Sequence, residues 1–411
     1  MTNIRAFKPN IVKETASTKV VSPAYDSMSN EERRDFRIDN PENYINVMQT
    51  IDDSIKEKGL SEDEILKENR QELDRLLSSG AYRKRDKDSL FVYELSVDGH
   101  SQIGIVAEIP VTEYQTGQIR KHEETRKEHE ERLSKYLDVV GASSSPICLA
   151  YECSSTINSI VEEIIQMTPE LDFSLSDELN QRIWRVDDPN TINALHKSFL
   201  HIDATYLTDG HHRAASTVRH AASRRSTSDV AGPWDHLLVA LLPSDQLRVL
   251  PYNRCVRDLG GRTAECLLDS LKAEFLIEEV SDDRIDTLPS KANQFLMIMG
   301  KSNILLTLPD QIVHKSPVKN LDVSLLQDLI LAPMLGITDV RGDPRLDYVT
   351  GDSGVKGLRQ RCHDDGWALG FACFPTSLPE LMAVANAKEA MPPKSTCFDP
   401  KPRAGIFVRL S

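Results

Sequence analysis

The pattern of apolar and polar positions predicts two neighbouring strands within residues 89–111. SLFVYELSV and then QIGIVAEIPV are short, mainly apolar runs rich in β-branched and aromatic residues, as strands are. Between them stands Asp98-Gly99, a pair that favours the tight turn of a two-residue hairpin. We therefore expect an antiparallel hairpin here.

Other segments repeat apolar residues every three or four positions, as amphipathic helices do. The clearest is SEDEILKENRQELDRLLSSG, in which Ser61 is expected to cap the helix, Glu64 to complete a capping box and Gly80 to end it. Its buried stripe is predicted to consist of Ile65, Leu66, Leu73, Leu76 and Leu77. Similar patterns predict helices in HEETRKEHEERLSKYLDVV, STINSIVEEIIQM, DDPNTINALHKSFL and DVSLLQDLILAP.

Strands are predicted to alternate with these helices. We expect them in SPICLAYE, in HLLVALL paired with LRVLPY, in WALGFACF, and at the end of the chain, where the last strand returns to a sheet. This alternation favours the α+β (mixed α/β) class, with helices packed on a sheet. We divide the chain into an N-terminal lobe (1–110), a central part (111–257) and a C-terminal lobe (258–411).

Composition restricts the partners. The chain has 411 residues and a formal net charge of -14, which argues against binding to nucleic acid or to an anionic membrane surface. No apolar run approaches the ~20 residues that cross a bilayer, and MTNIRAFKPN lacks the apolar stretch of a signal peptide. The seven cysteines include no CxxC pair. We expect a cytoplasmic protein with reduced thiols.

The segment ATYLTDGHHRAAST carries the most concentrated chemistry. It predicts a strand that passes through Asp209-Gly210-His211-His212-Arg213 into a helix. The first N–H groups of a helix lack partners and the helix dipole is positive there, which suits an anion. Gly210 allows a left-handed turn, Arg213 offers a fork for phosphate oxygens, and Asp209 is a candidate Mg²⁺ ligand. The alternative is an N-capping Asp209 followed by two surface histidines.

Five motifs in chain order resemble one known family. They are GQIRKHEETRKEHEERL, SSSPI, LTDGHHRAAS, LDVSLLQDLILAPMLGI and MPPKSTCFDPKPRAGIF, and the opening IRAFKP with VSPAYD also fits, although Ala24 stands where the family usually repeats proline. By these motifs the chain resembles the uncharacterised DUF1015 family over nearly its whole length. That family is similar in turn to free L-serine kinases, which have a ParB/sulfiredoxin-like catalytic core. The resemblance implies that residues 111–257 form this catalytic core, with a helical insertion, and that the C-terminal lobe (258–411) completes the site.

The resemblance to these kinases implies roles for particular residues. It places the general base on Glu123, beside His122, and the nucleotide phosphates at Asp209 to Arg213. It adds Lys394, Ser395 and Thr396 as further phosphate contacts and, more loosely, Tyr252 near the acceptor. The implied reaction is phosphoryl transfer from ADP or ATP, with Mg²⁺, to the hydroxyl of free L-serine or a similar compound. Without the resemblance, HEETRKEHEER is typical of a solvated helical face, and PPKST of a rigid turn.

Two other functions stay open. The first is a nucleotide-binding or nucleotide-hydrolysing regulatory protein on the same core, which requires a homodimer and a partner surface. The second is a phosphatase that uses the Asp209 corner to orient water. The N-terminal lobe has no counterpart in the characterised kinases, and we expect inserted helices, including QRIWRVDD, between Glu123 and Asp209.

Overall fold

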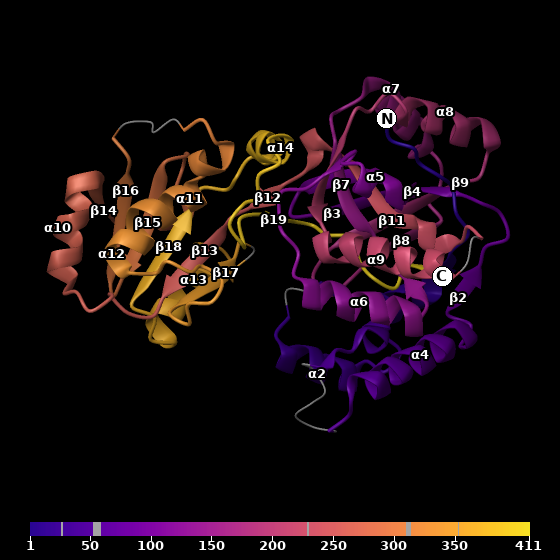
Figure 1. Ribbon diagram of the computed structural model, residues 1–411, viewed down its shortest axis with the longest axis horizontal. Helices are drawn as coiled ribbons and strands as arrows, with labels where there is room; N and C mark the ends of the chain where they lie inside the picture. The colour runs from indigo at the N-terminus through magenta and orange to yellow at the C-terminus, as the bar shows by residue number, and fades with distance from the viewer. Residues whose placement is uncertain (26–27, 52–58, 228–229, 310–313, 352) are drawn as a thin grey trace. The chain divides into compact units, whose positions relative to one another are not determined.

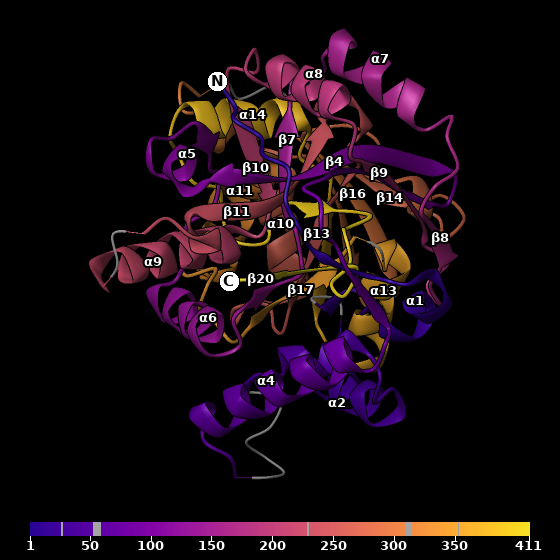
Figure 2. The same cartoon turned by 90° about the vertical axis from the view of Figure 1, so that its right-hand side faces the viewer.

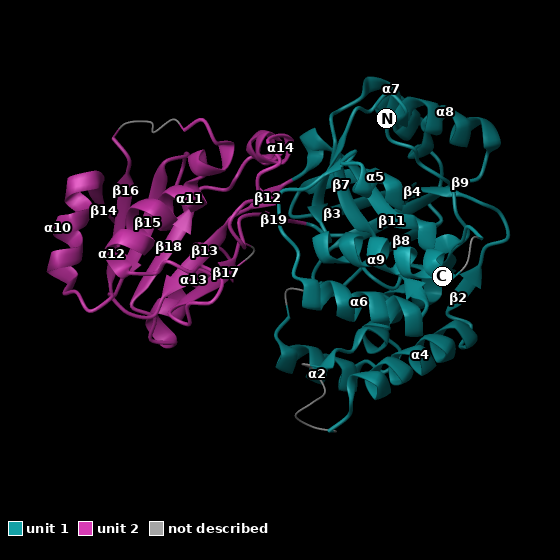
Figure 3. Ribbon diagram, viewed as in Figure 1, with its two compact units in different colours: residues 1–247, 400–411 teal, residues 248–399 magenta. Residues whose placement is uncertain are grey.

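The chain forms two compact units. The computed structural model describes residues 1–25, 28–51, 59–227, 230–309, 314–351 and 353–411. Unit 1 comprises residues 1–247 together with 400–411, and unit 2 comprises residues 248–399 (Figure 3). The last twelve residues thus belong to the unit in which the chain begins.

An eight-stranded mixed sheet forms the centre of unit 1 (Figure 1). The predicted hairpin supplies two of its strands, and Asp98 and Gly99 both have the positive φ angles that a tight turn needs (51° and 73°). In sheet order the strands are β5 (Ile119–Arg120), β10 (Thr205–Asp209), β7 (Ile147–Tyr151), β11 (His236–Pro243), β4 (His100–Pro110), β3 (Leu90–Val97), β9 (Asn180–Val186) and β8 (Leu171–Ser174).

The two faces of this sheet are both apolar and have different coverings. On β3, Leu90 and Val92 belong to one buried cluster, while Phe91 and Tyr93 belong to the other, as the period of two requires. The first face is covered by α5 (Val111–Gln115), α7 (Ser155–Ile164), α8 (Pro189–Phe199) and α9 (His211–Thr227). The second face packs on a small sheet of β2 (Tyr82–Lys84), β1 (Asn10–Val12), β20 (Phe407–Leu410) and β6 (Ala142–Ser143).

Further helices of unit 1 extend this second face. Among the described residues they include α1 (Glu14–Val20), α2 (Asn30–Asp39), η2 (Tyr44–Met48), α4 (Glu62–Ser78) and α6 (Lys127–Val139). Helix α4 confirms its predicted start, because Ser61 and Glu64 form the capping box. Helix α6 lies between α4 and α9 in both views (Figures 1 and 2). An ion pair from Arg219 to Glu130 (3.0 Å) ties α9 to α6.

Unit 2 is built on a six-stranded sheet that also has helices on both faces. Its strands are, in sheet order, β14 (Leu276–Val280), β16 (Ser302–Thr307), β15 (Gln294–Met299), β18 (Leu369–Cys373), β13 (Tyr252–Val256) and β17 (Leu346–Thr350). A short ribbon pairs β12 (Val249–Leu250) with β19 (Cys397–Phe398). Its helices include α10 (Ala264–Glu274), α11 (Asp322–Leu326), the π-helical η7 (Gln327–Leu331), α12 (Ala332–Leu335), α13 (Gly354–Asp364) and α14 (Leu378–Asn386).

The mixed sheets and their helices confirm the α+β class. Several local predictions were wrong. QRIWRVDD contributes strand β9 rather than a helix, because its buried positions alternate and it pairs with β3 and β8. The strands HLLVALL and LRVLPY do not pair with each other: β11 joins β4 and β7, and β12 joins β19. Helix α6 begins only at Lys127, so His122 and Glu123 lie in the loop before it.

The observed division of the chain also differs from the three predicted lobes. The predicted boundary after residue 110 falls at the end of β4, whose neighbours β3 and β11 lie on opposite sides of that boundary in sequence. A single sheet therefore joins the first two predicted lobes. The last residue of the predicted turn VSPAYD, Asp26, lies outside the described residues. No helix in the described parts of the chain is long and apolar enough to cross a membrane.

Candidate active site

The strand-to-helix corner predicted from ATYLTDGHHRAAST is present in unit 1. Strand β10 ends at Asp209, Gly210 follows with φ = 94°, and α9 begins at His211. The first helical hydrogen bond runs from Ala214 N to Gly210 O (2.9 Å). The N–H groups of the first turn precede this bond and therefore have no acceptor within the helix. The corner thus has the polarity that an anion requires.

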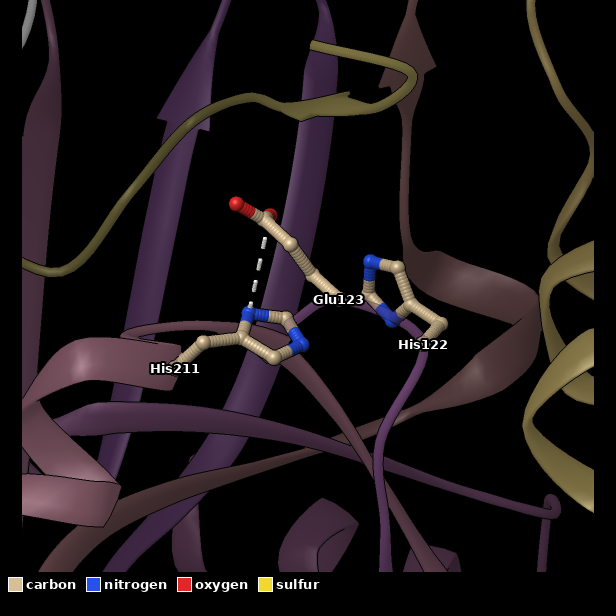
Figure 4. A group of neighbouring side chains, drawn as sticks. All are labelled: His122, Glu123 and His211. Atoms are coloured by element: carbon tan, nitrogen blue, oxygen red, sulfur yellow. Dashed lines mark ion pairs between the residues drawn. The ribbon is translucent and has the colours of Figure 1, made fainter. Parts of the chain in front are cut away.

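Parallel pairing brings the loop with His122 and Glu123 to this corner. Strand β5 pairs in parallel with β10, with Ile119 opposite Thr205 and Arg120 opposite Tyr206. Because parallel strands leave a sheet at the same edge, the residues after β5 run beside the end of β10. Glu123 Oε2 lies 4.0 Å from Nδ1 of His211, and the rings of His122 and His211 meet edge to face with centroids 4.6 Å apart (Figure 4).

The two histidines of this group are buried, and their carboxylate neighbour is not. His122 is 2% exposed and His211 6%, whereas the Glu123 side chain is 40% exposed. Burial lowers the pKa of His122 to about 4, against a hydrogen bond to the backbone of Leu207 that raises it. Burial, and then the neighbouring His122, hold the pKa of His211 well below its ordinary value. Both imidazoles are therefore neutral at neutral pH.

His122, Glu123 and His211 also form a group that can hold a metal ion. One ligand atom of each residue lies within 4.8 Å of the other two. Asp209, the predicted Mg²⁺ ligand, is not a member of this group. His212 points elsewhere, toward α6, where its ring centroid is 5.1 Å from that of His129. Neighbouring positions on a helix face different directions, so the adjacent residues His211 and His212 have different surroundings.

Arg213 is held by acceptors of the protein itself, although its side chain is 29% exposed. Its Nη1 donates to the carbonyl oxygens of Ser145 (2.8 Å) and Pro146 (3.0 Å) and to the Ser145 hydroxyl, and its Nη2 pairs with Asp209. A Cβ atom on Gly210 would meet the same guanidinium at 3.0 Å. Arg213 therefore clamps the SSSPI segment to the corner. Its predicted contact with phosphate stays a prediction.

A second cation at the corner, Lys401, was not singled out from the sequence. Its Nζ lies 2.9 Å from Oδ1 of Asp209, whose other oxygen pairs with Arg213. Burial opposes the charged form of Asp209, but Lys401 and Arg213 outweigh it and hold the carboxyl pKa below its ordinary value. Two cations on one carboxylate leave a net positive charge. The only signal in the sequence was the position of Lys401 in the motif FDPKPRAGIF.

The other predicted site residues lie in unit 2. The Lys394 ammonium is 5.1 Å from the centroid of the Tyr252 ring, and Arg254 donates to the Lys394 carbonyl (3.2 Å). Lys394 is exposed and has a positive φ of 58°. The hydroxyl of Ser395, a buried residue beside Thr396, donates to Pro392 O (2.6 Å). Lys394 and Tyr252 are thus neighbours, and Ser395 supports the turn.

Comparison with known proteins places the chain in a family. Residues 4–324 match the family described as "Protein of unknown function (DUF1015)", and the chain belongs to this family. No curated protein matches it significantly.

Several solved structures are similar at low identity. They include a free serine kinase in complex with AMP (12% identity, 74% of this chain and 91% of that chain, TM-score 0.35). A conserved hypothetical protein from Pyrococcus furiosus is similar at 13% identity (74% and 95%, TM-score 0.36). SbnI with a C-terminal truncation from Staphylococcus aureus is similar at 12% (74% and 87%, TM-score 0.39). The ParB/sulfiredoxin-like core that the motifs imply stays a prediction.

Proposed function

We propose that this protein is a small-molecule kinase. It transfers a phosphoryl group from ADP or ATP to the hydroxyl of free L-serine or a similar compound. The acceptor oxygen attacks the terminal phosphorus, the bond to the leaving nucleotide breaks, and the hydroxyl proton passes to Glu123. The products are the phosphorylated acceptor and AMP or ADP.

The observation that carries this proposal is the position of Glu123 beside the first turn of α9. A helix N-terminus is a site for phosphate groups, and its donors act on the charge that develops during phosphoryl transfer. The Glu123 carboxylate is partly exposed and 4.0 Å from the first helical residue, His211. An acceptor hydroxyl between carboxylate and phosphate has a base on one side and an electrophile on the other.

The charges at the corner support the same assignment. We propose Lys401 as the side chain that contacts the polyphosphate, because its ammonium brings a positive charge to this corner, 2.9 Å from Oδ1 of Asp209. Arg213 ties the corner to the carbonyl oxygens of Ser145 and Pro146. Each carboxylate oxygen of Asp209 is already paired with a cation, Arg213 or Lys401. We therefore assign Mg²⁺ to the phosphate oxygens of the nucleotide and not to Asp209. When bound, Mg²⁺ neutralises phosphate charge. The roles of Lys394, Ser395, Thr396 and Tyr252 stay predictions.

The test is a product analysis of the purified protein. It is incubated with Mg²⁺, ADP or ATP, and a panel of amino acids and other small hydroxyl compounds, and products are identified by mass spectrometry. We expect a phosphorylated acceptor from the wild type and at least about 100-fold less from Glu123→Gln, since general base catalysis contributes on the order of 10²–10⁴-fold. The matched control is Glu124→Gln, which removes the neighbouring exposed carboxylate.

The other outcomes would change the proposal in different ways. Equal product from Glu123→Gln and wild type would keep the kinase function but exclude Glu123 as the base. Nucleotide loss without a phosphorylated acceptor would indicate a hydrolase. Tight nucleotide binding with neither reaction would indicate a regulatory protein.

A further inference from the structure

The group of His122, Glu123 and His211 has an unexplained feature at its centre. His211 is 6% exposed, and among the residues that the structure describes neither of its ring nitrogens makes a hydrogen bond. Nε2 is buried without a partner, and Nδ1 lies 4.0 Å from the Glu123 carboxylate, beyond hydrogen-bond distance. A buried polar group left without a partner costs about 1–3 kcal/mol. Nδ1, the nitrogen that faces Glu123, is therefore the atom of this imidazole that can serve as a ligand, whereas Nε2 keeps no partner among the described residues.

We propose that His122, Glu123 and His211 bind one divalent transition-metal ion, such as Zn²⁺ or Co²⁺. We further propose that the bound ion withholds the Glu123 carboxylate from substrate and so inhibits the protein. The second statement rests on the proposed kinase function, whereas the first does not.

The ligand atoms are close enough to converge on such an ion. Zn²⁺ lies about 2.0–2.2 Å from nitrogen and oxygen ligands, so two ligand atoms at a tetrahedral angle on one ion are roughly 3.3–3.6 Å apart. The 4.0 Å between His211 Nδ1 and Glu123 Oε2 exceeds this spacing by roughly half an ångström. The widest separation in the group is within 4.8 Å and requires a movement of up to roughly 1.5 Å. Glu123 is 40% exposed, so rotation of its side chain can bring its carboxylate closer to the histidines.

The types of ligand select the kind of metal. Two imidazoles and one carboxylate are typical of zinc and cobalt sites, whereas Mg²⁺ and Ca²⁺ require oxygen ligands. Three protein ligands also leave a coordination position for water. This ion is therefore distinct from the Mg²⁺ that accompanies a nucleotide.

One feature of the corner opposes a cation. His211 begins α9, and the positive end of a helix dipole disfavours a cation by about 0.3–1 kcal/mol. Apparent binding free energies for zinc at protein sites reach ~10 kcal/mol or more, so the dipole lowers the affinity without preventing binding. The Lys401 and Arg213 cations are paired with Asp209, which reduces their repulsion.

The test measures metal binding to the full-length protein in the absence of nucleotide. Protein stripped of metal by a chelator is titrated with Co²⁺, followed by visible absorption, and with Zn²⁺, followed by calorimetry. We expect one ion per chain with a tetrahedral or five-coordinate Co²⁺ spectrum, and at least about 100-fold weaker binding to His211→Gln and Glu123→Gln. The control His129→Gln, which changes an exposed histidine of α6, should bind like the wild type.

The outcomes separate this inference from the kinase proposal. No binding, or equal binding by wild type and His211→Gln, would overturn the metal site whether or not the protein is a kinase. If the wild type binds Zn²⁺ and phosphorylates an acceptor, stoichiometric Zn²⁺ should lower turnover at least tenfold, and a chelator should restore it. Unchanged turnover with the site filled would overturn the inhibitory role alone.

Discussion

The Nζ atom of Lys401 lies 2.9 Å from Oδ1 of Asp209, which brings the end of the chain to the corner between β10 and α9. Asp209, the last residue of β10, also pairs with Arg213 of α9, four positions further along the chain. The two cations differ in their surroundings, because Arg213 is held by the Ser145–Pro146 segment as well. Their substitution should therefore have different consequences.

Replacing Lys401 should weaken nucleotide binding more than it affects stability. Lys401→Met removes the ammonium that we assign to the polyphosphate, and we expect about a tenfold rise in the nucleotide dissociation constant, or about 1.4 kcal/mol. Lys401→Arg should restore much of the affinity, because it keeps the charge. Calorimetric titration with ADP or ATP measures the effect, and Lys127→Met on α6 is the control. Unaltered affinity in Lys401→Met would exclude the contact.

Replacing Arg213 should destabilise the fold. Arg213→Ala leaves Asp209 with one cation and the Ser145 and Pro146 carbonyls without this donor, so we expect the free energy of unfolding to fall by about 2–4 kcal/mol. Arg213→Lys should recover only part of this loss, since one ammonium cannot replace the planar fork. Urea unfolding gives the values. If Arg213→Ala unfolded at the same urea concentration as the wild type, the clamp would have no structural role.

Gly210 should tolerate alanine poorly. Its φ of 94° disfavours a side chain by about 1–2 kcal/mol, and the added Cβ would meet the Arg213 guanidinium at 3.0 Å. Gly117→Ala is a matched control, because Gly117 has φ = 80° but no atom within 4 Å of the added Cβ. We expect Gly210→Ala to cost at least about 1 kcal/mol more than Gly117→Ala. Equal losses would mean that the guanidinium moves aside freely.

Acid should unfold the protein partly through the buried histidines. The pKa of His122 is about 4 in the folded state and about 6.5 when unfolded, so the unfolded chain binds more protons between these values. The contribution of neutral His122 to the free energy of unfolding is fully present above pH ~6.5. It is lost as the pH falls toward 4, by at most about 1.4 kcal/mol per pH unit. His211, whose pKa is lowered in the same direction, adds to the loss.

The contribution of His122 can be isolated by substitution. The free energy of unfolding of His122→Gln should depend less steeply on pH over this range than that of the wild type, measured by urea unfolding at several pH values. His201→Gln, at an exposed histidine, should leave the slope as it is. Parallel curves for His122→Gln and wild type would show that other groups cause the acid sensitivity.

Local features were predictable wherever neighbouring residues decide the conformation. The Ser61–Glu64 capping box, the turn at Asp98-Gly99 and the change from strand to helix at Gly210 involve only residues close in sequence. The pattern of QRIWRVDD was interpreted as a helix, but this segment forms strand β9, which pairs with β3 and β8. The helix predicted to include His122 and Glu123 begins later, because the parallel β5–β10 pair holds that stretch as a loop.

What the sequence determined by itself was the kind of elements, the α+β class, the family resemblance and the corner at Asp209 to Arg213. These follow from periodicity, capping and short motifs, whose energies depend on contacts within a few residues. Tertiary structure decided that Glu123 lies against His211, that Lys401 shares Asp209 with Arg213, and that Arg213 binds the carbonyls of Ser145 and Pro146. These contacts join distant segments, and they depend on which strands pair in parallel and where the chain returns. No local pattern encodes that choice, because the free energy that selects it comes from burying the whole sheet.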